Sequence, residues 1–366
     1  KIDIIIFLIM NFKIPENIKT ILITGGAGFI GGWLVRRLLQ ETKITIINID
    51  KYSYASDLEG INNLLMKNAI NKERYFFFQT DLNNSEKISE ILFAKRPDYI
   101  MHLAAESHVD RSLENPLNFI ENNIIGTFNL LEATRLFFNS ISKKEQDLFL
   151  FHHISTDEVY GSLGEKGSFN EASNYDPRSP YSATKAASDH LVFAWHHSYG
   201  IPIKLTNCSN NYGPYQFPEK LIPLTILKCL KKEPIPIYGN GLQIRDWLHV
   251  EDHVDALFKV IKNGKTGQKY CIGGHGEKTN LEVVKTICSR FDELSPQNLP
   301  HSSLITMVED RPGHDTRYAI DPNLIQKELF WKPRYDFNKG IYQTISWYLN
   351  NEKWIEKMIE QSGYSG

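Results

Sequence analysis

The stretch TGGAGFIG, residues 24–31, decides the fold of this chain. An apolar run, Thr20–Thr24, precedes it and a helical period, Phe29–Gln40, follows it, so the pattern predicts a strand, a turn and a helix. Glycines with GxGxxG spacing make the turn tight, let a pyrophosphate approach the backbone and point the helix N-terminus at the anion. The stretch therefore predicts a dinucleotide-binding turn, and the alternative is an ordinary surface turn.

Asp50 is the second part of the same signal. It ends the next apolar run, Ile44–Ile49, and lies about 20 residues after the glycines. A carboxylate at this place accepts hydrogen bonds from ribose hydroxyls and repels a 2′-phosphate, which favours NAD over NADP. The neighbouring Lys51 weakens this argument, and the alternative is a surface aspartate.

The composition excludes several classes of protein. Hydrophobic residues make up 42% of the 366 residues, as in ordinary globular chains, and the length suits about two domains. The formal charge of −2 argues against general binding of nucleic acids. The cysteines lack CxxC spacing, which argues against a disulfide framework or structural zinc and favours the cytoplasm; they are Cys208, Cys229, Cys271 and Cys288.

Alternating apolar runs and helical periods predict a parallel sheet. The expected strands are Thr20–Thr24, Ile44–Ile49, Tyr75–Gln79, Tyr99–Leu103, Leu148–Ile154 and Ile203–Asn207. The expected helices are Phe29–Gln40, Glu86–Lys95, Pro116–Phe138 and Tyr181–Ser198. The fold class is α/β, a Rossmann-type doubly wound parallel sheet with a smaller, irregular C-terminal substrate-binding domain, because prolines interrupt the pattern after Asn207.

The domain boundaries should follow this change of pattern. We expect residues 20–207 to form the NAD-binding domain, with residues 245–275 returning to it, and residues 208–244 and 276–350 to bind substrate. Residues 1–19 would be an extension and residues 351–366 a tail. The apolar run Ile4–Met10 is far shorter than the roughly 20 residues of a membrane span and lacks a signal-peptide cleavage site, so no membrane binding is expected.

Tyr181 and Lys185 form the second chemical signal. Their spacing places both side chains on one face of an expected helix. An ammonium near the phenol lowers the pKa of the phenol and favours a phenolate, which takes a proton from a hydroxyl as hydride leaves. The alternative is a surface Tyr and a solvated Lys, but together with the glycine loop the pair resembles the extended short-chain dehydrogenase/reductase superfamily.

The third signal, STDEVYG at residues 155–161, follows a strand at the carboxyl edge of the sheet, where ligands bind. Thr156 supplies a hydroxyl beside the Tyr–Lys pair. The adjacent Asp157 and Glu158 supply two carboxyl groups, which suit chemistry with both a leaving hydroxyl and an abstracted carbon-bound proton. The alternative for the two acids is a solvated loop.

With these segments the chain resembles the dTDP-glucose 4,6-dehydratase family over most of its length, from about Thr20 to Tyr348. The other matching segments are HLAAESHVDRS (102–112), SPYSATKAASDHLV (179–192), TNCSNNYGPYQFPEKLIP (206–223), IPIYGNGLQIRDWLHVEDH (235–253), IGGHGEKTN (272–280) and DRPGHDTRYAID (310–321). Two positions depart from the family's pattern: Gly32 stands where Ser is usual, and Asn122 where a Thr is expected.

The resemblance implies dehydration of dTDP-glucose to dTDP-4-keto-6-deoxyglucose, in deoxysugar biosynthesis of the rhamnose type. Oxidation must come first, because C5–H is not acidic until C4 is a ketone. Tyr181, assisted by Lys185 and Thr156, would remove the C4 hydroxyl proton while NAD takes the C4 hydride. Glu158 would then take the C5 proton and Asp157 would protonate the departing C6 hydroxyl. The hydride would return to C6 and regenerate NAD.

The family also implies which residues bind the two ligands. The expected cofactor residues are Gly25, Gly28, Phe29, Ile30, Gly31, Asp50, Asp81, Leu82, Ala104, Ala105, Tyr181 and Lys185. The expected substrate residues are Ser107, His108, Asn210, Lys220, Leu221, Pro236, Tyr238, Arg245, Asn280, Arg311 and His314. Arg245 and Arg311 would hold the diphosphate, since Arg matches phosphate geometry, and their alternative is an ion pair with the adjacent Asp246 or Asp310.

Two expected helices also suggest a homodimer, because related enzymes pair such helices across an interface. These helices, Pro116–Phe138 and Tyr181–Ser198, carry more apolar residues than one buried face needs, and the alternative is burial within one subunit. The apolar residues are Phe119, Leu130, Leu131, Phe137, Phe138, Leu191, Val192, Phe193 and Trp195.

Histidines are the remaining candidates for chemistry. His102, His152 and His153 lie in strand contexts and are expected to be structural. The pair His196 and His197 lacks a third spaced ligand, so no metal is predicted.

Other functions remain open at this point. A nucleotide-sugar 4-epimerase shares the fold and the Tyr–Lys pair but does not need paired Asp157 and Glu158, and a dehydratase for another nucleotide sugar would share both. A non-enzymatic NAD sensor would be expected to lose Tyr181 and Lys185.

Overall fold

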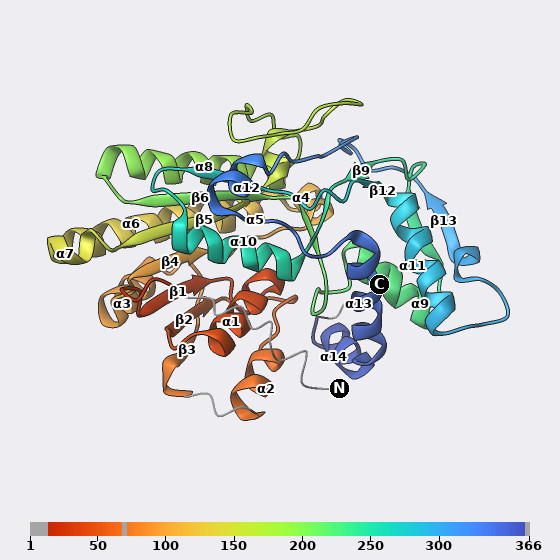
Figure 1. Ribbon diagram of the computed structural model, residues 1–366, viewed down its shortest axis with the longest axis horizontal. Coiled ribbons are helices and arrows are strands. Elements are labelled where there is room, and N and C mark those ends of the chain that lie inside the picture. Colours follow the sequence, from red (N-terminus) through yellow and green to blue (C-terminus); the bar gives the residue numbers. More distant parts are fainter. Residues whose placement is uncertain (1–13, 68–71, 363–366) are drawn as a thin grey trace.

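The computed structural model describes residues 14–67 and 72–362, and its centre is a seven-stranded parallel sheet (Figure 1). The expected apolar run Ile4–Met10 lies outside the described residues. The strand order is β11-β6-β5-β4-β1-β2-β3, which is the doubly wound Rossmann order, so the predicted fold class is confirmed. The strands are β1 (Thr20–Thr24), β2 (Thr45–Asp50), β3 (Tyr75–Gln79), β4 (Tyr99–His102), β5 (Leu150–Thr156), β6 (Ile203–Cys208) and β11 (Lys269–Ile272).

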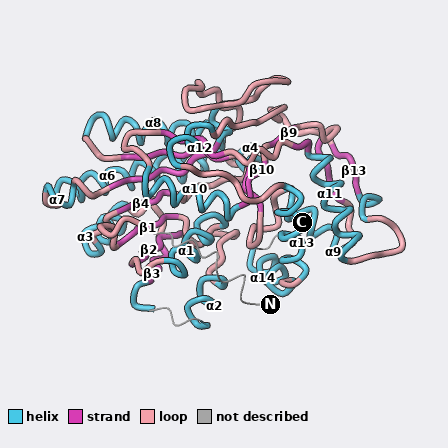
Figure 2. The backbone as a smooth tube through the Cα atoms, viewed as in Figure 1, coloured by secondary structure: helices cyan, strands magenta, loops and turns pink. Residues whose placement is uncertain are grey.

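Helices cover both faces of this sheet (Figures 1 and 2). On one face Leu34, from the first helix after β1, packs in a cluster with Val254. On the other face Ile88, Leu130 and Val192 share a second cluster with strand residues. Burial on both faces explains why the strands read as continuous apolar runs. The covering helices are α1 (Phe29–Glu41), α2 (Glu59–Lys67), α10 (Val250–Asn263) and α12 (Asn323–Leu329) on one face, and α3 (Ser85–Lys95), α6 (Gly126–Ser140) and α8 (Pro180–Tyr199) on the other.

The long helix expected over Pro116–Phe138 is helical throughout but irregular. It divides into α5 (Pro116–Phe119), the π-helical segment η3 (Ile120–Ile125) and the start of α6. A π-helical turn widens the spacing of successive side chains, and such turns are frequent at functional sites. The other short helices are α4 (Val109–Glu114), α7 (Lys143–Gln146), and the 3-10 turns η2 (Lys72–Arg74), η4 (Asp157–Tyr160) and η5 (His301–Leu304).

The C-terminal half builds a second apolar core around four helices, which include α9 (Leu221–Lys231) and α11 (Asn280–Leu294). Helix α13 (Phe337–Leu349) and helix α14 (Glu352–Ser362) complete it, and Trp354 of α14 is buried there. Most of the stretch expected to be a tail is therefore a packed helix, because its apolar side chains complete this core. Three two-stranded sheets accompany it: β7 (Asn210–Tyr212) with β10 (Trp247–His249), β9 (Ile244–Arg245) with β12 (Lys278–Thr279), and β8 (Ile235–Tyr238) with β13 (Ile305–Val308).

The expected domain boundaries stay a prediction. Strand β11 and helix α10, both within the expected return segment 245–275, do belong to the sheet and its cover. At the other end, Ile14 and Ile18 of the expected N-terminal extension are buried against the first core, because both are apolar side chains beside the sheet.

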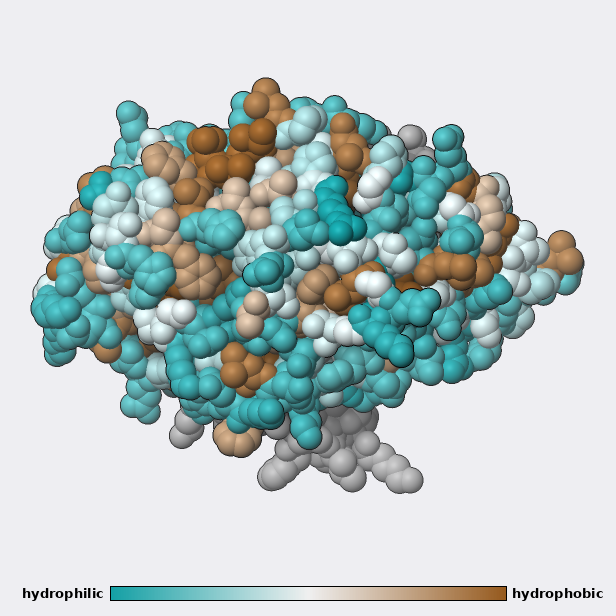
Figure 3. All heavy atoms as spheres, turned by 90° about the horizontal axis from the view of Figure 1, so that it is seen from above, coloured by the Kyte–Doolittle hydropathy of each residue, from teal (hydrophilic) through white to brown (hydrophobic). Residues whose placement is uncertain are grey.

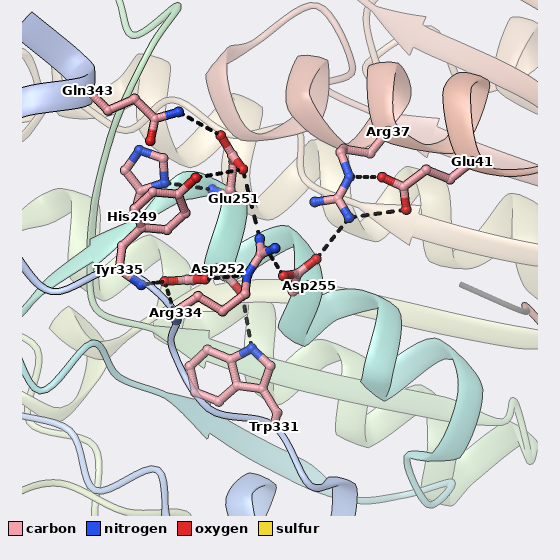
Figure 4. A network of polar contacts seen from close by, with 10 residues as sticks. All are labelled: Arg37, Glu41, His249, Glu251, Asp252, Asp255, Trp331, Arg334, Tyr335 and Gln343. Atoms are coloured by element: carbon pink, nitrogen blue, oxygen red, sulfur yellow. Dashed lines mark hydrogen bonds and ion pairs between the residues drawn. The ribbon is translucent and has the colours of Figure 1, made fainter. Parts of the chain in front are cut away.

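A polar network ties helix α1 to the C-terminal half (Figure 4). Asp255 of α10 accepts from Arg37 of α1 at 2.9 Å and also pairs with Arg334 at 2.6 Å. Asp252, one turn earlier, accepts from the backbone N–H of Tyr335 at 2.9 Å. Two carboxylates on one helix face thus fix the segment that leads into α13.

The apolar residues that suggested a dimer are largely buried within the subunit. Phe119, Leu130, Leu131, Phe137, Phe138 and Val192 are buried, and Leu191, Phe193 and Trp195 are partly buried, so the alternative of burial within one subunit holds for this set. Other apolar side chains of the same helices are exposed instead: Leu117, Ile120, Ile125, Phe128 and Leu136. Figure 3 looks onto the side where α8 lies in Figure 1 and shows separate apolar patches among polar residues.

Candidate active site

A cavity of about 840 Å³ opens at the carboxyl ends of the strands, between the sheet and the second core. In doubly wound sheets this edge is where ligands bind. Of the predicted site residues, all except Asp157 line this single cavity: Gly25, Gly28, Phe29, Ile30, Gly31, Asp50, Asp81, Leu82, Ala104, Ala105, Ser107, His108, Thr156, Glu158, Tyr181, Lys185, Asn210, Lys220, Leu221, Pro236, Tyr238, Arg245, Asn280, Arg311 and His314. The segments singled out in the sequence therefore meet in one cavity, and the individual roles of their residues stay predictions.

The glycine loop forms one end of the cavity. Gly25 has a φ of +74°, and a Cβ there would lie 2.7 Å from the backbone nitrogen of Ala104, so no side chain fits. Helix α1 begins after Gly28, which makes no side-chain cap, so the first backbone N–H groups of the helix keep their hydrogen-bonding capacity. This arrangement fits a dinucleotide pyrophosphate.

Asp50 and Lys51 lie beside the loop. The Asp50 carboxylate accepts hydrogen bonds from the backbone N–H groups of Ala27 at 3.0 Å and Tyr52 at 2.8 Å. Burial raises the pKa of Asp50, and these hydrogen bonds oppose that effect. The Lys51 ammonium donates to Glu106 at 2.5 Å and to the Asn122 side chain at 2.8 Å, so its charge is balanced within the protein. Lys51 is therefore not a free cation for a 2′-phosphate.

Tyr181 and Lys185 lie in the first turns of α8, whose start is strongly specified. Ser179 and Ser182 form a capping box, and Pro180 occupies the first helical position. Both functional side chains are buried, at 7% and 4% exposure, and the Lys185 ammonium donates to the carbonyl of Ile154 at 3.0 Å. The capped helix thus presents both groups at the end of β5.

The pKa of Tyr181 differs from the expectation. Burial and the nearby Glu158 and Cys208 raise the pKa of Tyr181 well above its ordinary value, and a hydrogen bond with Thr156 acts in the opposite direction. The expected lowering by Lys185 is not among the main effects on this phenol, and the largest effect is burial, which removes the solvation of the phenolate. Tyr181 is therefore a neutral phenol in this structure.

Asp157 and Glu158 occupy the 3-10 turn η4, where the Thr156 hydroxyl accepts from the N–H of Glu158 at 3.3 Å. Glu158 lines the cavity, whereas Asp157 is 1% exposed and lies behind its wall. In a 3-10 turn successive side chains point about 120° apart, so the two acids point in different directions. The role of Asp157 toward substrate stays a prediction.

Burial favours the neutral form of both acids. Burial, the charge of Glu158 and the charge of Asp246 raise the pKa of Asp157 well above its ordinary value. Burial also raises the pKa of Glu158, but the cations Lys220, Arg245 and Arg311 oppose it. The two carboxyl groups therefore have different electrostatic surroundings, with more cations opposing the shift at Glu158.

The second half of the cavity is basic. Arg245 is buried, donates to the carbonyl of Asp315 at 3.0 Å and lies over the Tyr318 ring, 4.3 Å from its centroid. The adjacent Asp246 accepts hydrogen bonds from the backbone N–H groups of Gly274 and Gly276. Arg245 therefore does not form the ion pair with Asp246 that was the alternative to phosphate binding. Arg311 pairs with a different acid, Asp110, at 2.6 Å.

Lys220 and Asn280 complete this basic end. Lys220 donates to the carbonyl of Ser107 at 2.7 Å, which joins the segment before α9 to the loop after β4. Asn280 is the first residue of α11 and lines the cavity. Cations and helix starts contributed by the second core therefore face the glycine loop across the cavity, as an extended diphosphate ligand requires.

The sequence argument missed one polar cluster in the cavity wall. Glu219 accepts from the Tyr54 hydroxyl at 2.9 Å, and the Arg111 guanidinium lies over the Tyr54 ring, 3.7 Å from its centroid. His108 is near the same carboxylate, at 3.9 Å, and burial lowers the pKa of His108 to about 4. Glu219 and Arg111 both lie in family-matching segments, which is the signal that could have identified them.

The three histidines expected to be structural, His102, His152 and His153, are all buried. His102 bonds Thr24 at 2.7 Å and Thr127 at 2.9 Å, and His152 and His153 are fully buried. Within residues 14–67 and 72–362, no group of His, Cys, Asp and Glu could hold a metal ion, and no helix is long and apolar enough to cross a membrane.

Comparisons with known proteins agree with this geometry. The GDP-mannose 4,6 dehydratase family model matches residues 22–344. A dTDP-glucose 4,6-dehydratase from Salmonella typhimurium is 52% identical over 347 residues, which cover 92% of this chain and 95% of the relative. One from Neisseria meningitidis is 50% identical over 349 residues, or 94% and 97% of the two chains.

Solved structures give the same result. The dTDP-glucose 4,6-dehydratase of Bacillus anthracis, in complex with NAD, has a TM-score of 0.80 and 38% identity and covers 93% of this chain and 99% of its own. A UDP-glucose 4-epimerase from Thermus thermophilus, also complexed with NAD, has a TM-score of 0.76 at only 26% identity, with coverage of 91% and 99%. The chain belongs to the dTDP-glucose 4,6-dehydratase family, within the extended short-chain dehydrogenases/reductases.

Proposed function

We propose that this chain is a lyase that converts dTDP-glucose into dTDP-4-keto-6-deoxyglucose with bound NAD, in deoxysugar biosynthesis. The observation that carries the proposal is the single cavity that gathers the glycine loop, the Tyr181–Lys185 pair, Glu158 and a basic end. An epimerase shares the loop and the Tyr–Lys pair, but it has no use for two adjacent acids.

Tyr181 is the group for the first proton transfer. NAD, which the glycine loop and Asp50 would hold, would supply a hydride acceptor for C4 of the sugar and later a hydride donor for C6. Lys185 lies one helical turn after Tyr181 and brings a positive charge beside the site, and the hydrogen bond with Thr156 favours loss of the phenolic proton. Tyr181 then takes the C4 hydroxyl proton and holds it until the final step.

Glu158 and Asp157 act after C4 has become a ketone. Glu158, at the cavity wall, removes the C5 proton, and its cationic neighbours keep part of its population ionised. Asp157 is the protonated acid that supplies a proton to the departing C6 hydroxyl. Because Asp157 lies behind the wall, its role requires a rotation of the η4 turn or of the side chain.

The first expected result concerns the basic end. Arg245→Ala and Arg311→Ala should each raise the substrate KM, with a smaller effect on kcat. The expected loss of binding free energy is about 1.5–3 kcal/mol, the value of one charged hydrogen bond. Arg317→Ala is the matched control, because Arg317 is a buried arginine that pairs with Glu277 outside the cavity. Steady-state kinetics measure KM and kcat for each variant. An unchanged KM in both variants would show that these arginines do not bind the diphosphate.

The second expected result concerns cofactor choice. Asp50→Ala should reduce the preference for NAD over NADP about tenfold or more, because a charged hydrogen-bond acceptor and a repulsive charge are both lost. Asp57→Ala is the control: Asp57 is nearby but outside the cavity, and its carboxylate accepts from Trp354 and from the Glu59 N–H. Cofactor titrations monitored by fluorescence give the ratio, and equal binding of both cofactors by the unchanged chain would contradict this role.

The overall function is tested by incubating the chain with NAD and dTDP-glucose and following the product by mass spectrometry. Loss of one water from the sugar supports dehydration, whereas a product of unchanged mass with an inverted C4 supports the epimerase. A parallel incubation with UDP-glucose tests whether the base is recognised. Turnover of UDP-glucose alone would contradict the proposed substrate.

We also propose a homodimer and a cytoplasmic location. The exposed side chains Leu117, Ile120, Phe128 and Leu136 form the candidate interface on the α5–α6 helices, in place of the buried residues named above. The cysteines are all free and buried, which suits a reducing compartment.

A further inference from the structure

We propose that Asp189 is a positioning residue that acts on the reaction through Lys185 and through the strand end that carries Thr156. This inference rests on the proposed function. Asp189 does not line the cavity, so it cannot act on substrate or cofactor by contact.

Asp189 lies one turn after Lys185 on α8, so the two side chains share a face of the helix. It is fully buried, and its carboxylate accepts from the Tyr175 hydroxyl at 2.7 Å and from the Asn207 amide at 3.3 Å. The ring of His153, on β5, places Nε2 at 3.1 Å from the other carboxylate oxygen. Three elements therefore converge on one buried carboxylate.

The contacts of Asn207 extend this cluster to the site. Its side-chain amide also donates to the backbone carbonyl of Thr156 at 2.9 Å, and its oxygen accepts from the Tyr160 hydroxyl at 3.1 Å. Thr156 is the residue from which η4, with its two acids, begins. Asp189 thus holds Asn207, and Asn207 holds the end of β5 in place.

The charge of Asp189 acts on Lys185. Burial alone would raise the pKa of Asp189, but the hydrogen bond and charge of His153, the charge of Lys185 and the Tyr175 hydroxyl together lower it. Burial lowers the pKa of His153 to about 4, so the negative charge resides on Asp189 at neutral pH. A buried carboxylate with an ordinary or lower pKa needs a cation nearby, and Lys185 is that cation.

The reverse effect on Lys185 follows from the same geometry. Burial lowers the pKa of Lys185, and Asp189 and the Cys208 thiol oppose this effect. The other groups facing Lys185 are His153 and His102, both buried and with lowered pKa values, so they are neutral. Asp189 is therefore the carboxylate that favours the protonated form of Lys185, the cation one helical turn after Tyr181.

The first arm of the test is the pH profile of Asp189→Asn, after mass spectrometry has shown that the unchanged chain dehydrates dTDP-glucose. Without the anion Lys185 loses its proton more easily, so the alkaline limb of kcat should move to lower pH by about one unit, with little change in KM. Tyr175→Phe is the matched control, because it removes a hydrogen bond to the same carboxylate but keeps the charge. An unchanged limb in Asp189→Asn, or an equal shift in Tyr175→Phe, would overturn the proposal.

The second arm does not depend on activity. Removing one of two opposite buried charges leaves the other less compensated, whereas replacing both by neutral groups is often tolerated. Lys185→Met combined with Asp189→Asn should therefore unfold at a higher temperature than Asp189→Asn alone, even if the single variant is mostly unfolded. A double variant that is less stable than the single one would contradict the pairing, and inactivity of the unchanged chain would count against the proposed function only.

Discussion

Replacing Tyr181 with phenylalanine is expected to stop the reaction at its first step. The variant keeps the ring and its packing but loses the phenol, at the start of α8, that acts as the base for the C4 hydroxyl proton. Loss of one proton-transfer catalyst costs about 10²–10⁴-fold in rate. Rapid mixing of Tyr181→Phe with dTDP-glucose and NAD should therefore show no transient absorbance of the reduced cofactor, while both ligands still bind.

Tyr99→Phe is the control for this experiment. Tyr99 is another fully buried phenol, but it lies in β4 and outside the active-site cavity, so its variant should reduce the cofactor at the normal rate. If Tyr181→Phe also formed reduced cofactor at the normal rate, another group would be the base and the role of the Tyr–Lys pair would be wrong.

The sheet could be predicted because its strands are buried on both faces. Such strands read as short apolar runs between polar breaks, and the predicted start of β5 differs from the observed one by only two residues. The seventh strand, β11, lacked a prediction of its own because Lys269–Ile272 is only four residues long. Its position was implied only by the expected return of residues 245–275 to the sheet.

The cavity was predictable to a similar degree, since the carboxyl edge of a parallel sheet collects the residues that follow each strand. What the sequence could not supply was the direction of side chains within a turn. Asp157 and Glu158 are adjacent in the chain, and only the structure shows that Glu158 lines the cavity while Asp157 is buried outside its lining. The residues of a dimer interface were beyond the sequence for the same reason, because a count of apolar residues such as Leu130 does not say which ones face inward.

Contacts between distant segments were also beyond the sequence. The hydroxyl of Tyr54 and the carboxylate of Glu219 come together although 165 positions separate them, and no local pattern encodes that approach. The π-helical segment η3 is a similar case, because its residues have ordinary helical periodicity. Its effect is chemical: it carries Asn122, the departure from the family's pattern, which hydrogen-bonds Lys51.

Glu158→Gln is expected to separate elimination from oxidation. The amide removes the base for the C5 proton but leaves Tyr181, Lys185 and the glycine loop in place, so hydride transfer from C4 should survive. Exchange of the C5 hydrogen with deuterated solvent should fall together with turnover, by about 10²–10⁴-fold. The control is Glu171→Gln, a half-buried glutamate outside the cavity whose carboxylate accepts from the Cys271 N–H, and its exchange rate should be normal.

Asp157→Asn should behave differently from Glu158→Gln, and this difference tests the mechanism. The raised pKa of Asp157 makes it a proton donor at neutral pH, so its amide should leave C5 exchange intact while loss of the C6 hydroxyl slows. Measured side by side, exchange without dehydration in Asp157→Asn and neither process in Glu158→Gln would assign the acid and the base. If Glu158→Gln kept normal C5 exchange and dehydration, the base would have to be another cavity residue. If Asp157→Asn dehydrated substrate at the normal rate, Asp157 would not be the acid and would stay behind the cavity wall during the reaction. The proton for the leaving hydroxyl would then have to come from a residue that lines the cavity.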